Sequence, residues 1–134
     1  MRPTQIDHVG IAVADLEAAV EWYHTILGLE PSHRERMQDQ GVEEVLFEVG
    51  PSFVQLLGAL GPRTPVGRFL ERRGPGLHHV GYRVDDVVDA LDQLRAEGVR
   101  LIDEAPRRGS RGTTIAFVHP KDMGGVLVEL VQEA

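Results

Sequence analysis

The stretch "DHVGIAVADLEAAVEWYHTILGLE" (7–30) decides the fold, because the chain repeats it as "HHVGYRVDDVVDALDQLRAEGVR" (78–100). His8 aligns with His79, and the same alignment pairs Val9 with Val80, Gly10 with Gly81, Val13 with Val84 and Asp15 with Asp86. Only two copies are present, which indicates a tandem duplication and not a repeat array.

Each copy predicts a strand, a helix and then a run of strands. The first helix begins near Asp15, a favourable N-cap residue, and ends at Gly28. Its spacing places one face toward the core: Leu16, Val20, Tyr23 and Leu27. The second helix begins at Asp85 or Asp86 and ends at Gly98. Its apolar face is Val87, Leu91 and Leu94.

Runs rich in alternating or β-branched residues follow the two helices and predict strands. They cover 42–49, 53–57, 113–119 and 125–131. A linking segment rich in proline and glycine separates the copies, and we expect a short helical turn within it at 66–74. The sequence therefore predicts an α+β protein with one domain, 1–134, built of two modules at about 5–60 and 76–132.

Composition limits the possible partners. The chain has no cysteine, which excludes disulfides and thiolate metal sites, and its net charge of −7 argues against a nucleic-acid partner. No apolar run reaches membrane-spanning length, so we expect a cytoplasmic protein with no membrane partner. One locally basic stretch can bind a phosphorylated small molecule: Arg107, Arg108, Arg111 and Lys121.

Two pairs of polar residues recur in register within apolar strands. His8 and His79 begin the first strand of each copy on the face away from the helix, where small side chains follow them. Gln55 falls opposite Glu129 in the last strand of each copy. A single histidine on a strand face is more often structural, as we expect for His78, which faces the other way. Because both pairs recur in register, we interpret these four residues as functional and not as structural.

A sheet that curls into a trough would bring these four side chains together. Two imidazoles, one amide oxygen and one carboxylate suit one borderline divalent ion per chain, with open positions left for water or a chelating substrate. The donor set points to Co²⁺, Mn²⁺, Ni²⁺ or Zn²⁺ and leaves the choice among them open.

Four motifs of the chain resemble the vicinal oxygen chelate superfamily, and within it the methylmalonyl-CoA epimerases. They are "DHVGIAV", "GLHHVGYRVDDV", "LIDEAPRRGSRGT" and "IAFVHPKDMGGVLVELVQ". The first two are shared with glyoxalase I and dioxygenase relatives, and the last two are more specific to the epimerases. The resemblance implies paired βαβββ modules that form a curved mixed sheet around a metal-binding cleft, and it implies a homodimer.

The same resemblance assigns roles to residues. It makes the metal ligands His8, Gln55, His79 and Glu129, with Co²⁺ as the first choice of ion. It makes Glu44 a catalytic carboxylate, with Glu43 as the neighbouring candidate. Strand parity favours Glu44, because Glu43 shares its face with an expected core row of Val45, Phe47 and Val49.

The activity that the resemblance implies is metal-dependent interconversion of (2R)- and (2S)-methylmalonyl-CoA. Glu44 and Glu129 would remove and return the C2 proton through a metal-stabilised enediolate, and which glutamate serves which stereoisomer stays open. Five residues are candidates for binding the acyl-CoA: Arg107, Arg108, Arg111, His119 and Lys121. The alternatives are a glyoxalase I-like lyase or isomerase and a non-catalytic small-molecule-binding protein of the same fold.

Overall fold

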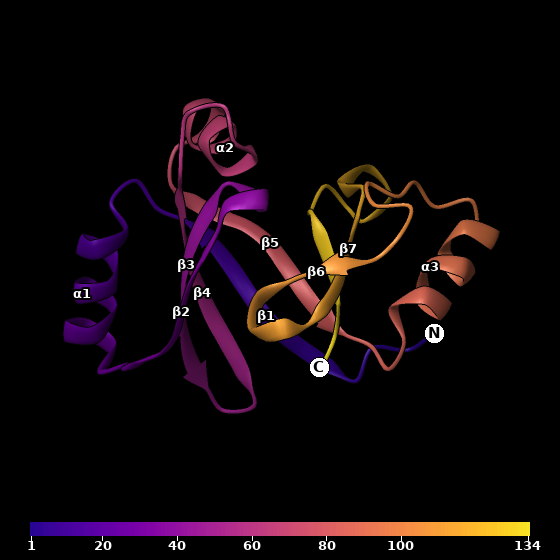
Figure 1. Cartoon of the computed structure of the whole chain (residues 1–134), viewed down its shortest axis with the longest axis horizontal. Helices are drawn as coiled ribbons and strands as arrows, with labels where there is room; N and C mark the ends of the chain where they lie inside the picture. The colour runs from indigo at the N-terminus through magenta and orange to yellow at the C-terminus, as the bar shows by residue number, and fades with distance from the viewer. The chain divides into compact units, whose positions relative to one another are not determined.

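A computed structural model describes residues 1–134 and contains three α-helices and eight strands (Figure 1). In chain order they are β1 Gln5–Ala12, α1 Leu16–Leu27, β2 Pro31–Met37, β3 Val42–Val49, β4 Ser52–Ala59, α2 Pro65–Arg73, β5 Gly76–Arg83, α3 Val87–Ala96, β6 Arg107–Arg108, β7 Thr114–Val118 and β8 Val128–Gln132. The predicted α+β class is confirmed, and no helix is both long and apolar enough to cross a membrane.

The chain divides into two compact units. The terminal unit consists of Met1–His8 and His79–Ala134, and the central unit is Val9–His78. Strands β1 and β5 each contribute residues to both units. Neighbouring strands are hydrogen-bonded in the order β2-β3-β4-β1 and onward through β5-β8-β7-β6. Because β5 and β8 are parallel while β3 and β4 are antiparallel, the sheet is mixed, as expected.

In the central unit, α1 lies beside β2, β3 and β4 (Figure 1). The helix begins as predicted, since the Asp15 side chain accepts a hydrogen bond from the Ala18 amide at 3.1 Å. It ends at Gly28, whose φ of 66° suits a residue without Cβ. The ring of Tyr23 stacks on Phe47 with centroids 6.0 Å apart. Leu27 was expected on this face but is 60% exposed, because it lies at the end of the helix beyond the core.

The predicted helical turn between the copies is a helix, α2. Thr64 caps it through a hydrogen bond from the Gly67 amide to the Thr64 hydroxyl at 3.1 Å. Val66 is buried in the second core cluster of the central unit, where Phe69 and Leu70 pack against it. The helix therefore belongs to the packed core of this unit and is more than a connection.

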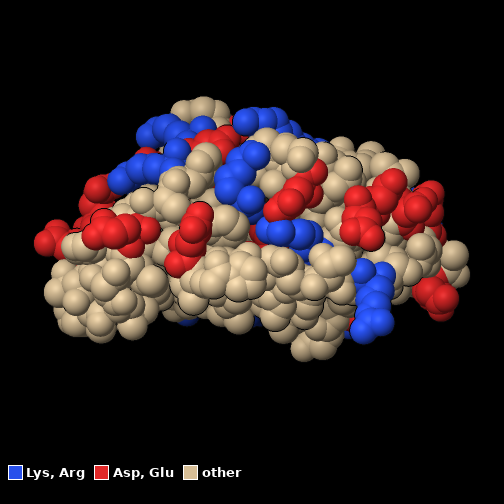
Figure 2. Space-filling view, turned by 90° about the horizontal axis from the view of Figure 1, so that it is seen from below, with Lys and Arg blue, Asp and Glu red and all other residues tan.

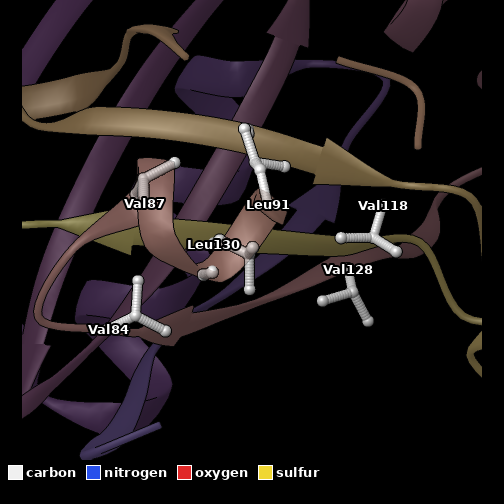
Figure 3. Packing of buried hydrophobic residues seen from close by; sticks show 8 residues of the cluster. Val84, Val87, Leu91, Val118, Val128 and Leu130 are labelled. Carbon is white, nitrogen blue, oxygen red and sulfur yellow. The ribbon is translucent and has the colours of Figure 1, made fainter. Parts of the chain in front are cut away.

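In the terminal unit, α3 covers one face of the strands. Asp86 is its N-cap and accepts from the Asp89 amide at 3.0 Å. Figure 3 shows the cluster that joins the helix to β7, β8 and the segment after β5. Its members are Val84, Val87, Ala90, Leu91, Ala116, Val118, Val128 and Leu130. This cluster confirms Val87 and Leu91 as buried residues, with Leu94 partly buried beside them.

Two strands, β2 and β6, were not predicted, and β8 begins three residues later than the expected run 125–131. Strand β2, with the sequence "PSHRERM", was not predicted, because its polar alternation carries no apolar face and only pairing with β3 makes it a strand. In β3 the bounds 42–49 are confirmed. Val49, however, was expected in the core and is 47% exposed, since it lies at the turn into β4.

Candidate metal centre

Three of the predicted site residues meet inside the terminal unit. His8, His79 and Glu129 are buried, with exposed fractions of 5%, 3% and 6%. The His8 Nε2 atom lies 2.9 Å from His79 Nε2 and 2.8 Å from a Glu129 carboxylate oxygen. The third side of the triangle, from His79 Nε2 to the same oxygen, is 3.6 Å. Residues separated by up to 121 positions in the chain thus turn three donor atoms toward one point.

The sheet fixes the direction of Glu129. In β8 its neighbours Val128 and Leu130 are both in the core cluster beneath α3 (Figure 3). Because alternate residues of a strand point to opposite faces, Glu129 projects from the face away from α3. The pairing of β5 with β8 sets Gly81 directly opposite Glu129.

Gly81 makes room for His8. A Cβ atom at position 81 would lie 2.4 Å from His8 Cε1 and 2.7 Å from His8 Nδ1, well inside van der Waals contact. The sequence indicated that small side chains follow each histidine, and the structure gives the reason for this glycine. Its backbone does not require positive φ, so the constraint is the imidazole ring alone.

Asp7 orients the His8 ring. Its buried carboxylate lies 2.7 Å from His8 Nδ1 and also accepts hydrogen bonds from Arg83, at 2.6 Å, and Arg111, at 3.0 Å. An ionised carboxylate only accepts, so Nδ1–H is the donor and Nε2 faces Glu129. This is the carboxylate–histidine arrangement that supports metal-ligating imidazoles. The sequence prediction missed Asp7, because the duplication aligns it with His78.

The electrostatics of the metal-free site favour a cation. Burial opposes charge on His8, but the Glu129 and Asp7 carboxylates outweigh it and raise the pKa of His8 to about 9. Burial likewise acts to raise the pKa of Glu129, yet His8 and His79 hold it well below its ordinary value. For His79, burial dominates and lowers the pKa. At neutral pH a proton on His8 therefore supplies the positive charge that Glu129 requires.

A divalent ion fits the three donor atoms. Metal–nitrogen and metal–oxygen distances are about 2.0–2.2 Å. The triangle of donors has sides of 2.8, 2.9 and 3.6 Å, none longer than twice that distance, so one ion can reach all three atoms. Two imidazole nitrogens and one carboxylate oxygen suit a borderline divalent ion, and the buried group can hold one.

Glu44 and Gln55 form a second polar cluster, within the central unit. The exposed fraction of Glu44 is 0% and that of Gln55 is 5%. The Gln55 side-chain amide donates a hydrogen bond to one Glu44 oxygen at 2.5 Å. The Gln55 carbonyl oxygen is buried without a hydrogen-bond partner, which is unusual for a polar atom in a protein interior. Glu43, the neighbouring candidate, instead pairs with Arg34 at 3.0 Å.

The predicted phosphate contacts lie in loops and short strands of the terminal unit. Arg107 pairs with Asp103 at 3.3 Å and stacks over the Phe117 ring at 5.4 Å, while Arg111 binds Asp7. Arg108 is exposed. Figure 2 shows Lys and Arg interspersed with Asp and Glu on one face of the molecule.

The other two predicted substrate contacts follow β7. His119 accepts a hydrogen bond from the Lys121 amide at 3.0 Å and so caps a short turn, and the Lys121 side chain is exposed. His78, expected to be structural, packs its ring edge-on against Phe69 with centroids 5.0 Å apart. Substrate binding remains a prediction for five residues, which are Arg107, Arg108, Arg111, His119 and Lys121.

The chain is similar to known proteins over most of its length. Residues 7–117 match the family model of the glyoxalase/bleomycin resistance protein/dioxygenase superfamily. The chain is 38% identical over 130 residues to the ethylmalonyl-CoA/methylmalonyl-CoA epimerase of Cereibacter sphaeroides, covering 96% of this chain and 97% of that protein.

Two solved structures are similar over almost the whole chain. The crystal structure of methylmalonyl-CoA epimerase from Mycobacterium tuberculosis has a TM-score of 0.95 and 46% identity, covering 98% of this chain and 89% of that one. A methylmalonyl-CoA epimerase in complex with methylmalonyl-CoA and NH4+ has a TM-score of 0.96 and 42% identity, covering 99% and 96%.

Proposed function

Because the chain belongs to the glyoxalase/bleomycin resistance protein/dioxygenase superfamily and, within it, to the methylmalonyl-CoA epimerases, we propose that it is an isomerase that inverts C2 of methylmalonyl-CoA with the help of a divalent ion. The observation that carries the proposal is the buried group of His8, His79 and Glu129, whose donor atoms lie within reach of one ion. A protein that only sequestered a small molecule would not require this group.

The reaction requires removal of a proton from a carbon between a thioester and a carboxylate, followed by return of a proton to the opposite face. The difficulty is the negative charge that develops as the carbanion is delocalised into an enediolate. A bound divalent ion supplies Lewis-acid stabilisation of that charge. His8 and His79 would hold the ion with neutral imidazoles, and Asp7 would keep the His8 ring in the required orientation.

Glu44 and Glu129 are the proposed bases. Inversion needs one carboxylate to take the C2 proton on one face and another group to return a proton on the other face. His8 and His79 hold the pKa of Glu129 well below its ordinary value, so Glu129 is in the ionised form that a base requires. Glu44 is buried and held through one oxygen by the Gln55 amide, which fixes the direction of its carboxylate.

Gln55 is the proposed fourth ligand. Its side-chain nitrogen is used by Glu44, and this hydrogen bond leaves the carbonyl oxygen as the free acceptor. A buried acceptor without a partner costs about 1–3 kcal/mol, a penalty that a bound cation would remove. Co²⁺ remains our first choice of ion. Acyl-CoA binding by the loop arginines, His119 and Lys121, a homodimer and a cytoplasmic location complete the proposal.

The proposal is tested by following the C2 proton of methylmalonyl-CoA by NMR in D₂O. Protein stripped with a chelator is compared with and without added Co²⁺, together with the variants Glu44→Gln and Glu129→Gln. Glu48→Gln is the matched control, because Glu48 is exposed on the same strand as Glu44. We expect rapid washout only with metal, and loss of washout, or washout from one stereoisomer alone, in the two site variants.

Two outcomes would contradict it. Absence of washout in the metal-loaded wild type would overturn the epimerase assignment, and hemithioacetals would then be the substrates to test. Washout at the wild-type rate in both glutamate variants would leave the activity in place and overturn the two-base scheme.

A further inference from the structure

Helix α2 and the turn before it carry a concentration of positive charge in an acidic chain. Between Glu48 and Asp85 the sequence has a single acidic residue, Glu71, although the whole chain has a net charge of −7. Four arginines lie on the helix or just before it, and all four are exposed. These residues, called the α2 arginines below, are Arg63, Arg68, Arg72 and Arg73.

No carboxylate neutralises the α2 arginines. None of their four side chains makes a hydrogen bond or an ion pair, and Arg73 lies over the ring of Phe69 at 5.7 Å. The loop arginines differ in this respect, since Arg107, for example, pairs with Asp103. The guanidinium groups along α2 are therefore open to an anion from solution.

Helix stability explains only part of this charge. A cation in the last turn of a helix interacts favourably with the helix dipole, which accounts for Arg72 and Arg73. The same dipole disfavours a cation just before the N-terminus, where Arg63 lies. The positive charge of this segment is therefore not fully explained by the stability of the helix.

Helix α2 packs against the face of the sheet that carries Glu44 and Gln55. Val66 of the helix lies in one cluster with Val42 of β3 and Leu57 of β4. Alternate residues of a strand share a face, so Val42 shares its face with Glu44, and Leu57 shares its face with Gln55. The contact at Val42 is about 7 Å along the strand from Glu44. Figure 1 shows α2 at one end of these strands.

Gly67 fixes the helix against the turn that carries Arg63. A Cβ atom at position 67 would lie 2.2 Å from the Gly61 carbonyl oxygen, so only glycine allows this approach. The Thr64 hydroxyl donates to the same carbonyl at 2.8 Å and accepts from the Gly67 amide at 3.1 Å. The backbone that presents the arginines is thus held in place before any ligand binds, which lowers the entropic cost of binding.

Methylmalonyl-CoA joins its acyl group to its phosphates through the long pantetheine arm. The groups that bind the phosphates must therefore lie away from the base that takes the C2 proton. Guanidinium groups suit phosphate oxygens, because their donors match the geometry of the anion. We propose that the α2 arginines bind the phosphate groups of the acyl-CoA, an inference that rests on the epimerase function proposed above. They add to the loop residues and act in binding, not in proton transfer.

The test measures the affinity of the Co²⁺-loaded protein for acetyl-CoA by calorimetric titration, together with kcat and KM for methylmalonyl-CoA. We expect Arg68→Gln and Arg72→Gln each to weaken acetyl-CoA binding and to raise KM by roughly fivefold, the upper end for an exposed charge pair. The kcat should stay near the wild-type value, because a contact remote from C2 binds the ground state and the transition state equally.

Methylmalonyl-pantetheine, which keeps the acyl group and the arm but has no phosphate, separates phosphate binding from a change in the fold. With this substrate the two variants should match the wild-type kcat/KM, because the missing guanidinium has no phosphate to bind. Added sodium chloride should narrow the difference between wild type and variants with methylmalonyl-CoA, since salt screens exposed charges.

Arg36→Gln is the matched control. Arg36 is exposed, makes no ion pair and lies in the same unit, so its loss removes the same charge. It pairs with Glu43 of β3, and adjacent residues of a strand point to opposite faces, so Arg36 lies on the face away from Glu44. Its substitution should leave the acetyl-CoA affinity and KM unchanged.

The outcomes separate the inference from the function on which it rests. An inactive Co²⁺-loaded wild type would overturn the epimerase function, and the acetyl-CoA titration would still decide whether the α2 arginines bind the phosphates. Wild-type affinity for acetyl-CoA in both Arg68→Gln and Arg72→Gln would overturn the inference alone. An equal loss with methylmalonyl-pantetheine would also overturn it, because a purely structural role predicts that pattern.

Discussion

At the scale of single residues, the candidate site depends on two residues that are not themselves candidate metal ligands. His8, His79 and Glu129 supply the donor atoms, but Gly81 provides the space for the His8 ring and Asp7 its orientation. The duplication revealed the histidines and Glu129, because each has a counterpart in the other copy.

Asp7 had no such signal. Asp7 matters because the fold brings Arg83 and Arg111 to the same carboxylate, a contact between residues 76 and 104 positions apart. This contact depends on tertiary pairing, which the local pattern of a single sequence does not encode.

The substitution Gly81→Ala tests the packing around His8. The new methyl group would overlap the imidazole and force it to move, so we expect the affinity for Co²⁺ to fall by roughly tenfold or more, the loss that follows when a ligand is misoriented. Equilibrium titration of the metal-free protein measures it. Gly61→Ala is the control, because its added Cβ would have only Thr64 Cγ2 nearby, at 4.0 Å. Equal affinities in the two variants would contradict the account.

If His8 is a metal ligand as proposed, protons and metal compete for its imidazole. Because the pKa of His8 is raised to about 9, the imidazole is protonated at neutral pH in the metal-free protein, and an ion must displace that proton. His79 and Glu129 are already in their ligating forms, since the pKa of each is lowered.

We therefore expect about one proton to be released per ion bound at pH 7, and the apparent affinity to rise about tenfold per pH unit until it levels off near pH 9. Calorimetric titration in buffers of different ionisation enthalpy measures the proton release. Binding at neutral pH without release of a proton would show that His8 is not protonated in the metal-free protein or is not a ligand.

At the scale of elements, helices were more predictable than strands. Asp15 and Asp86 marked the starts of both duplicated helices. An N-cap side chain accepts a hydrogen bond from a free amide of the first turn, and this local interaction does not depend on tertiary packing. The polar strand β2 escaped prediction, as it is an edge strand defined by hydrogen bonds to β3. Leu27 and Val49 have the expected periodicity but lie at element ends, where the core stops.

Helix α3 packs against the strands of the terminal unit through a buried apolar face. On this face Val87 is 0% exposed and the larger Leu91 is 2% exposed. We expect Leu91→Ala to lower the free energy of unfolding of the metal-free protein by about 2–5 kcal/mol, because it leaves a cavity against β7 and β8. Denaturant titration measures this. Val88→Ala, at a residue 53% exposed on the same helix, should change it by less than about 0.5 kcal/mol. Similar losses in both variants would contradict the packing described.

At the scale of the whole molecule, the sequence alone predicted the family, because the family's motifs extend along most of the chain. The similarity to methylmalonyl-CoA epimerases over almost the full length confirms this prediction. The duplication divides the sequence near residue 75, whereas the compact units divide it inside β1 and β5. Each unit therefore takes strand residues from both copies, and the terminal unit gathers His8 from the first copy with His79 and Glu129 from the second.

The most direct test of the central claim is the epimerisation rate of chelator-stripped protein during titration with Co²⁺. We predict negligible turnover without metal. The epimerisation rate should rise linearly with added Co²⁺ and reach a plateau at one ion per chain, and it should not rise in His8→Ala or Glu129→Ala. Full turnover by the metal-free protein, or a wild-type response in those variants, would contradict the claim that the buried His8, His79 and Glu129 group holds the ion on which the reaction depends.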